Sequence, residues 1–103
     1  MTAAAISPAQ LATLLEQPSP HALLDVRERA AFERGHIYRA TPLPRRLIEL
    51  RLPALVTAPG TLIVLYDDDG RLSALAAPTL AEMGYTEVFV LAGGLEAWRR
   101  AGQ

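Results

Sequence analysis

The feature that most constrains the fold of this chain is an alternation of short apolar runs with helical stretches. Residues 22–26, 61–66 and 87–91 are apolar runs of strand length; a helical stretch at 9–16 precedes the first run, and helical stretches at 28–34, 45–52 and 73–83 lie between the runs. Strands that alternate with helices form parallel sheets, and strands buried on both faces have nearly continuous apolar sequences. The sequence therefore predicts an α/β domain whose parallel sheet is covered by helices on both faces.

Local signals define the ends of several expected elements. Ser7 can cap the first helix and Pro8 suits its first position. Residues 45–52 have helical spacing, with Leu47, Ile48 and Leu50 expected to turn inward. The remaining expected elements are a helix at 28–34 ended by Gly35, a minimal strand at 40–41 and a closing helix at 95–101.

Pro78 lies inside the helix expected at 73–83. An interior proline removes one backbone hydrogen bond and clashes with the preceding turn, which costs about 3 kcal/mol. Either the helix bends at Pro78, or its regular part begins near Pro78 and the preceding loop is loosened. We expect the bend.

Length and composition indicate one domain spanning residues 1–103. Half of the residues are hydrophobic, enough for one closed core without disulfides or metal. Residues 1–5 lack the charged and apolar regions of a secretory signal. No apolar stretch approaches the roughly 20 residues that span a bilayer. We expect a cytoplasmic protein that does not contact membranes.

The charges are unevenly distributed although the net charge is only −1. Residues 27–51 contain seven arginines and three glutamates, and the chain has no lysine. This basic segment is either a solvated surface or an arginine-lined mouth that faces an acidic partner or an anion. Nucleic acid is not an expected partner, because aromatic residues are few and no domain-wide basic excess exists.

The loop at 66–73 joins the strand at 61–66 to the following helix. A strand, a tight loop and a helix in this order direct several backbone N–H groups at one point, which forms an anion site. The chain places three carboxylates of its own in this loop, those of Asp67, Asp68 and Asp69.

Four segments, in order, resemble a single rhodanese-like domain. They are the strand-to-helix entry at 23–28, the Gly-His-Ile turn within 32–37, the loop at 66–73 and the Gly-Gly…Trp helix at 91–98. The resemblance covers essentially the whole chain. It implies a five-stranded, mostly parallel sheet flanked by helices on both faces.

The chain departs from this family where the chemistry occurs. Active rhodaneses carry a loop of the form Cys-x-x-Gly-x-Arg, which binds sulfur as a cysteine persulfide. Here Asp67 occupies the nucleophile position and Leu72 the arginine position, while Gly70 and Ser73 are retained. The chain has no cysteine, so no persulfide can form. The resemblance implies the fold, and these residues argue against the activity.

Three roles are open to the acidic loop. Asp67 can be an internal anion that accepts the loop N–H groups and favours the helix dipole. It can be a nucleophile or general base, but that chemistry needs a cation such as Mg²⁺ and a helping lysine. The three carboxylates can bind a cation, but adjacent side chains converge poorly and the spacing is not that of a calcium loop. We expect the internal anion, with no metal and no cofactor.

The residues around the loop have further expected roles. Asp25 ends a strand near the ligand end of the sheet and should accept N–H groups of the next loop. We expect Asp25, Arg27 and Arg71 to be the binding residues, with Arg71 either entering the pocket or pairing with a neighbouring aspartate at the rim. His36 is expected to be a hydrogen-bonded part of the scaffold.

Together these observations predict a catalytically inert module with a binding, regulatory or accessory role beside sulfur-transfer proteins. Its expected partner is another protein or a tandem rhodanese domain, with a small anion as a further candidate. The alternative is an enzyme of sulfurtransferase or phosphatase type, or an anion-binding domain, that uses the loop at 67–73.

Overall fold

The structure is a computed structural model and describes residues 3–103; Met1 and Thr2, which belong to the segment tested above for a signal sequence, lie outside the described residues. Its elements, in chain order, are β1 (Ala4–Ile6), α1 (Pro8–Glu16), β2 (His21–Asp25), α2 (Arg29–Arg34), β3 (Thr41–Pro42), a 3₁₀ turn (Arg45–Leu47), α3 (Ile48–Leu55), β4 (Leu62–Tyr66), α4 (Arg71–Glu82), β5 (Val88–Leu91) and α5 (Gly94–Arg100).

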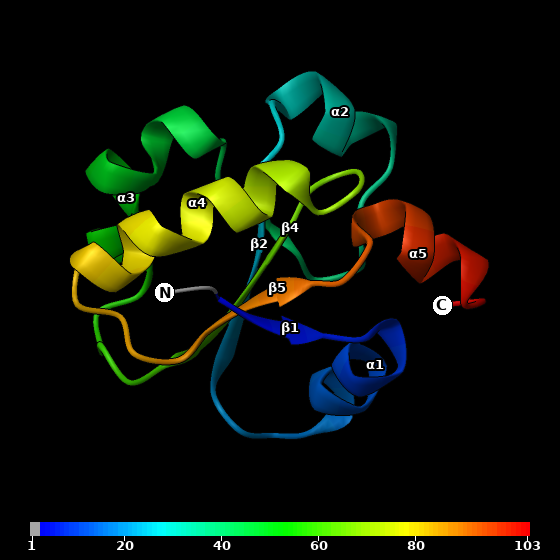
Figure 1. Cartoon of the computed structure of the whole chain (residues 1–103), viewed down its shortest axis with the longest axis horizontal. Helices are drawn as coiled ribbons and strands as arrows, with labels where there is room; N and C mark the ends of the chain where they lie inside the picture. Colours follow the sequence, from blue (N-terminus) through cyan, green and yellow to red (C-terminus); the bar gives the residue numbers. More distant parts are fainter. Residues whose placement is uncertain (1–2) are drawn as a thin grey trace.

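The strands form one sheet in the order β1-β5-β4-β2-β3, and every pair of neighbours is parallel (Figure 1). The predicted α/β fold with a five-stranded parallel sheet is therefore confirmed. β1 was not among the strands expected from the apolar runs. It pairs with β5 alone and forms one edge of the sheet.

Each face of the sheet carries its own hydrophobic core. Along β4, Ile63 and Leu65 pack on the side of α3 and α4, whereas Val64 and Tyr66 pack on the side of α1 and α5. This alternation follows from the two-residue period of a strand. Figure 1 shows α3 and α4 on one side of the strands and α1 and α5 on the other.

Helices α3 and α4 differ from two possibilities raised by the sequence. Leu50 was expected to face inward, but 76% of it is exposed, and Ile48 and Leu52 are the buried residues of α3. The segment starts as a 3₁₀ turn before the α-helix, which changes the face that each side chain occupies. Helix α4 is continuous from Arg71 to Glu82 with Pro78 inside it, so the alternative that its regular part begins near Pro78 is wrong.

The site described below lies at the carboxyl ends of the central strands. β2 and β4 are in register so that Asp25 is the partner of Tyr66, the last residue of β4. Within residues 3–103, none of the helices has the length and apolar character that crossing a membrane requires.

Candidate functional site

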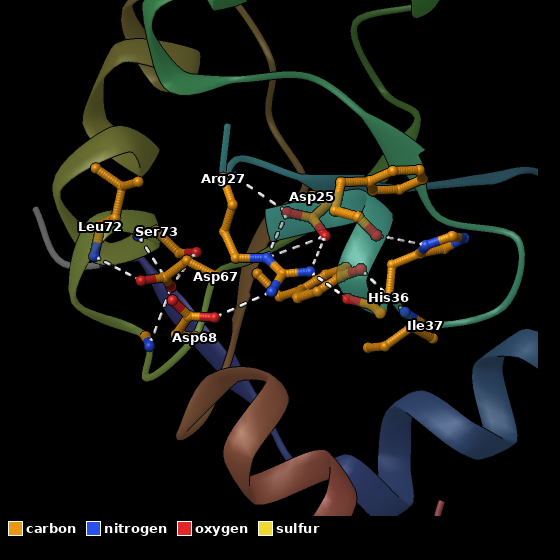
Figure 2. Close-up of polar contacts among 12 residues, drawn as sticks. Asp25, Arg27, His36, Ile37, Asp67, Asp68, Leu72 and Ser73 are labelled. Carbon is orange, nitrogen blue, oxygen red and sulfur yellow. Dashed lines mark hydrogen bonds and ion pairs between the residues drawn. The ribbon is translucent and has the colours of Figure 1, made fainter. Parts of the chain in front are cut away.

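The carboxylate of Asp67 lies at the centre of the loop between β4 and α4 and is almost completely buried, with 5% of the residue exposed. Its Oδ1 accepts hydrogen bonds from the backbone N–H of Gly70 at 3.0 Å, the N–H of Ser73 at 3.3 Å and the Ser73 hydroxyl at 2.7 Å. Its Oδ2 accepts from the N–H of Leu72 at 3.1 Å (Figure 2). Four donors of the loop thus converge on an anion that the chain itself supplies.

The start of α5 holds the backbone of this loop from the other side. The N–H groups of Leu95 and Glu96 donate to the carbonyl oxygens of Asp67 and Asp68 at 2.8 and 3.0 Å. Gly94 has a φ of 63°, and a Cβ there would lie 2.6 Å from the Asp67 carbonyl oxygen. Only glycine fits both this backbone conformation and this close approach.

Arg27 joins the loop to the rest of the site through a buried ion pair. Its Nε and Nη2 donate to the two carboxylate oxygens of Asp25 at 3.0 and 2.7 Å, and its Nη1 donates to Asp68 at 3.0 Å. Nη2 also donates to the carbonyl oxygen of Gly35 at 2.7 Å (Figure 2). The hydrogen bond to Asp25 is the largest cause that raises the pKa of Arg27 above its usual value. Arg27 and Asp25 are 8% and 0% exposed, so this pair is part of the interior.

The expected role of Asp25 as an acceptor of backbone N–H groups is seen in this arrangement. Its Oδ1 accepts the N–H of Arg27 at 3.0 Å as well as the guanidinium. Asp25 and Arg27 were expected to be binding residues, and the structure brings them together with Asp67 and Asp68. Their polar atoms are directed at one another, which leaves few donors for a ligand.

Tyr66 is a member of the site that was recognised from the sequence only as the end of a strand. It is fully buried, and its hydroxyl oxygen accepts the N–H of Ile37 at 3.1 Å. The guanidinium of Arg27 lies 5.9 Å from the centre of its ring. Burial raises the pKa of Tyr66 above its usual value. The register between Asp25 and Tyr66 explains this placement, and it cannot be read from the local sequence.

Arg71 and His36 lie at the edge of the site. Arg71 is exposed and its Nε is 3.6 Å from Asp69. It therefore pairs with a neighbouring aspartate at the rim and does not enter the pocket. The N–H of Arg71 also donates to Asp69 Oδ1 at 3.0 Å. His36 Nδ1 donates to the carbonyl oxygen of Phe32 at 2.9 Å and its ring stacks on Phe32, as expected of a scaffold residue.

The three aspartates of the loop have three different partners. Asp67 faces the loop donors, Asp68 faces Arg27 and Asp69 faces Arg71. Among residues 3–103, no group of three or more His, Cys, Asp or Glu side chains is arranged to hold a metal ion.

Comparisons with known proteins agree with this geometry. The family "Rhodanese-like domain" matches residues 7–101, so the chain belongs to the rhodanese-like domain family. A thiosulfate sulfurtransferase from Pseudomonas aeruginosa has a similar structure, with a TM-score of 0.90 and 38% identity over 96% of this chain and 19% of that one. A Rhodopseudomonas palustris protein of unknown function, described as a possible tyrosine phosphatase, has a TM-score of 0.87 and 28% identity over 97% of this chain and 82% of that one.

The similar curated proteins include the centrosomal protein of 41 kDa. The Gallus gallus protein is 38% identical over 84 residues, which are 75% of this chain and 23% of the relative. The Homo sapiens protein is 37% identical over the same share of this chain and 22% of its own length. The chain thus spans about a quarter of the length of these relatives. The functions of the full-length relatives are therefore not assigned to this domain.

Proposed function

We propose that this domain is a catalytically inert rhodanese-like module that acts by binding another protein. The observation that carries the proposal is the carboxylate of Asp67, which occupies the centre of the loop and accepts its four inward donors. A loop whose donors are already bound to an internal anion has little to offer an anionic substrate. The chain also has no cysteine to form a persulfide.

The neighbouring side chains support the same proposal. The family arginine is replaced by Leu72, which packs against the core of α3 and α4. Arg27, the nearest buried cation, is held by Asp25, Asp68 and the Gly35 carbonyl. The relatives named as a centrosomal protein are consistent with a role other than catalysis, although they concern much longer chains.

The test is the formation of thiocyanate from thiosulfate and cyanide. The natural domain is compared with an Asp67→Cys, Leu72→Arg double variant, and Asp67→Cys alone separates the two substitutions. We expect no activity from the natural domain above a protein-free control. Turnover by the double variant would show that the loop substitutions alone removed the activity.

One outcome would count against the proposal. Turnover by the natural domain would show a chemistry that needs no thiol and would contradict it directly. Loss of thiosulfate turnover on substituting Asp67→Asn in an active natural domain would then identify the aspartate as the group responsible. Circular dichroism of each variant shows whether it has folded.

A further inference from the structure

A groove beside α5 collects aromatic and basic side chains that the site above does not use. It has a volume of about 610 Å³ and lies between the end of α1, the loop that follows α2 and the end of α5. Leu15, Ile37 and the half-buried Trp98 supply apolar surface, and Tyr38, Arg39 and Glu16 also line it. We call it the Trp98 groove.

Most of the arginines in the basic segment are neutralised within the chain. Arg27 is buried in its ion pair with Asp25. Arg29, Arg45 and Arg46 pair at the surface with Glu33, Glu49 and Glu28, respectively. Arg71, the arginine of the loop at 66–73, pairs with Asp69.

The arginines at the end of α2, in the loop that follows it and at the end of α5 are different. Arg34, Arg39, Arg99 and Arg100 are exposed, and none of them has an ion pair with a described residue. Arg39 lines the groove. The Nη2 atom of Arg99 lies beside Gly35, 2.7 Å from the point that a Cβ on Gly35 would occupy, and so next to the loop that forms one wall. In Figure 1, α2 and α5 both lie in the right half of the view.

Tyr38 and Arg39, two exposed residues of this wall, lie in a turn with an unusual backbone conformation. Arg39 has a φ of 71°, which is unfavourable for a residue with a side chain. The turn is closed by the N–H of Ala40, which donates to the carbonyl oxygen of Ile37 at 3.0 Å. The Arg39 guanidinium lies 5.6 Å from the centre of the Tyr38 ring, although 80% of Tyr38 is exposed. Strained backbone of this kind is concentrated at functional sites.

We infer that the Trp98 groove binds an acidic segment of a partner protein, with an apolar side chain of that segment against Trp98 and Leu15. This inference rests on the proposed binding function and names its surface. The guanidiniums of Arg39 and Arg99 are exposed and come from separate elements, the loop after α2 and helix α5. Such an arrangement fits carboxylates spaced along an extended chain better than one small anion. Arg39 and Glu16 are the oppositely charged side chains that line the groove, and Arg99, which lies beside Gly35 next to one wall, adds a second exposed guanidinium.

The test uses Trp98 as its probe, because it is the only tryptophan of the chain. A short glutamate-rich peptide with one leucine and no aromatic residue is titrated while Trp98 fluorescence is recorded. We expect saturable binding that weakens as salt is added. The matched peptide with lysine in place of glutamate should not bind.

The double variant Arg39→Asn, Arg99→Gln should raise the dissociation constant of the peptide by about tenfold. Each exposed ion pair contributes only a small factor to the affinity, and the variant removes two of them. Asparagine tolerates the backbone conformation of Arg39. The matched control is Arg51→Gln on α3. Arg51 is exposed, has no ion pair among residues 3–103 and lines a different cavity. It should leave the dissociation constant unchanged within about twofold.

Three results would overturn the inference. They are the absence of saturable peptide binding, an equal loss in the Arg51→Gln control, and displacement of the peptide by sulfate with the same change in Trp98 fluorescence. The last result would show a small-anion site. Failure here leaves the thiocyanate assay untouched, since that assay depends on the loop at 66–73 and not on this groove.

Discussion

The hydroxyl of Ser73, in the first turn of α4, donates to Oδ1 of Asp67 in the preceding loop at 2.7 Å, and both residues are buried. The same oxygen also accepts the N–H of Ser73, so one residue of the helix engages the carboxylate twice. The aspartate therefore has a structural task that is separate from any chemistry at its position in the family.

Replacing Asp67 with alanine should destabilise the domain by about 2–4 kcal/mol, because several buried donors would lose their acceptor. Urea unfolding followed by circular dichroism measures the change. The control is Glu82→Ala at an exposed position of the same helix, which should alter the unfolding free energy by about 0.5 kcal/mol or less. Equal effects of the two substitutions would show that the Asp67 hydrogen bonds contribute nothing to stability.

Replacing Arg27 with methionine should lower the unfolding free energy by about 3–5 kcal/mol, because it leaves the fully buried Asp25 without its partner. Arg29→Met is the control, since Arg29 is 84% exposed in its pair with Glu33. That substitution should cost no more than about 1 kcal/mol. A double-mutant cycle with Asp25→Asn measures the coupling, and a coupling near zero would refute the interpretation of a single buried unit.

Substitution of Gly94 by alanine should separate α5 from the loop. The new Cβ would lie 2.6 Å from backbone atoms of Asp67 and Asp68, and the φ of 63° is unfavourable for alanine. We expect a loss of about 2–3 kcal/mol in urea unfolding. Gly60→Ala is the control because a Cβ there has no neighbour within 4 Å, and a similar loss in both variants would exclude the clash as the cause.

Burial of Tyr66 predicts a loss of stability at alkaline pH. Its pKa in the folded protein is raised above the ordinary value of about 10, so the unfolded chain releases this proton first. The contribution is complete below about pH 10 and is lost as the pH rises from there towards the folded pKa. We would measure the free energy of unfolding in urea between pH 8 and pH 11, in steps of about one unit. Above about pH 10 this free energy should fall less steeply with pH in Tyr66→Phe than in the natural domain. Because the chain has no lysine, few other groups titrate in this range, and an equal slope in the two proteins would contradict the assignment.

The central elements were predictable from the sequence because their signals are local. The apolar run of β4, the Ser7 cap of α1 and the glycine that ends α2 all depend on neighbouring residues. The capping box between Ser7 and Gln10 is present, with the Ser7 side chain accepting the Gln10 N–H at 3.1 Å. The convergence of loop donors on Asp67 was likewise expected, because a strand, a tight loop and a helix fix their directions.

The remaining features depend on contacts between distant segments. β1 consists of two alanines and Ile6, which have little strand signal of their own, and it forms by pairing with β5. Leu50 has the spacing of an inward residue but lies on the outer face of α3. The roles of Tyr66 and Gly94 arise from strand register and from the approach of α5, neither of which a single stretch of sequence contains.

The hydrogen bonds between the loop and the start of α5 also determine how these segments open to solvent. The amides of Leu95 and Glu96 are bonded to loop carbonyls, while the amides of Gly70, Leu72 and Ser73 are bonded to the side chain of the same loop. Asp67 links the two sets, because its carbonyl oxygen accepts from Leu95 and its carboxylate accepts from the loop amides, so we expect the loop and the start of α5 to behave as one cooperative unit in hydrogen exchange. A partner that binds α5 would then slow amide hydrogen exchange in the loop at 66–73 without contacting that loop.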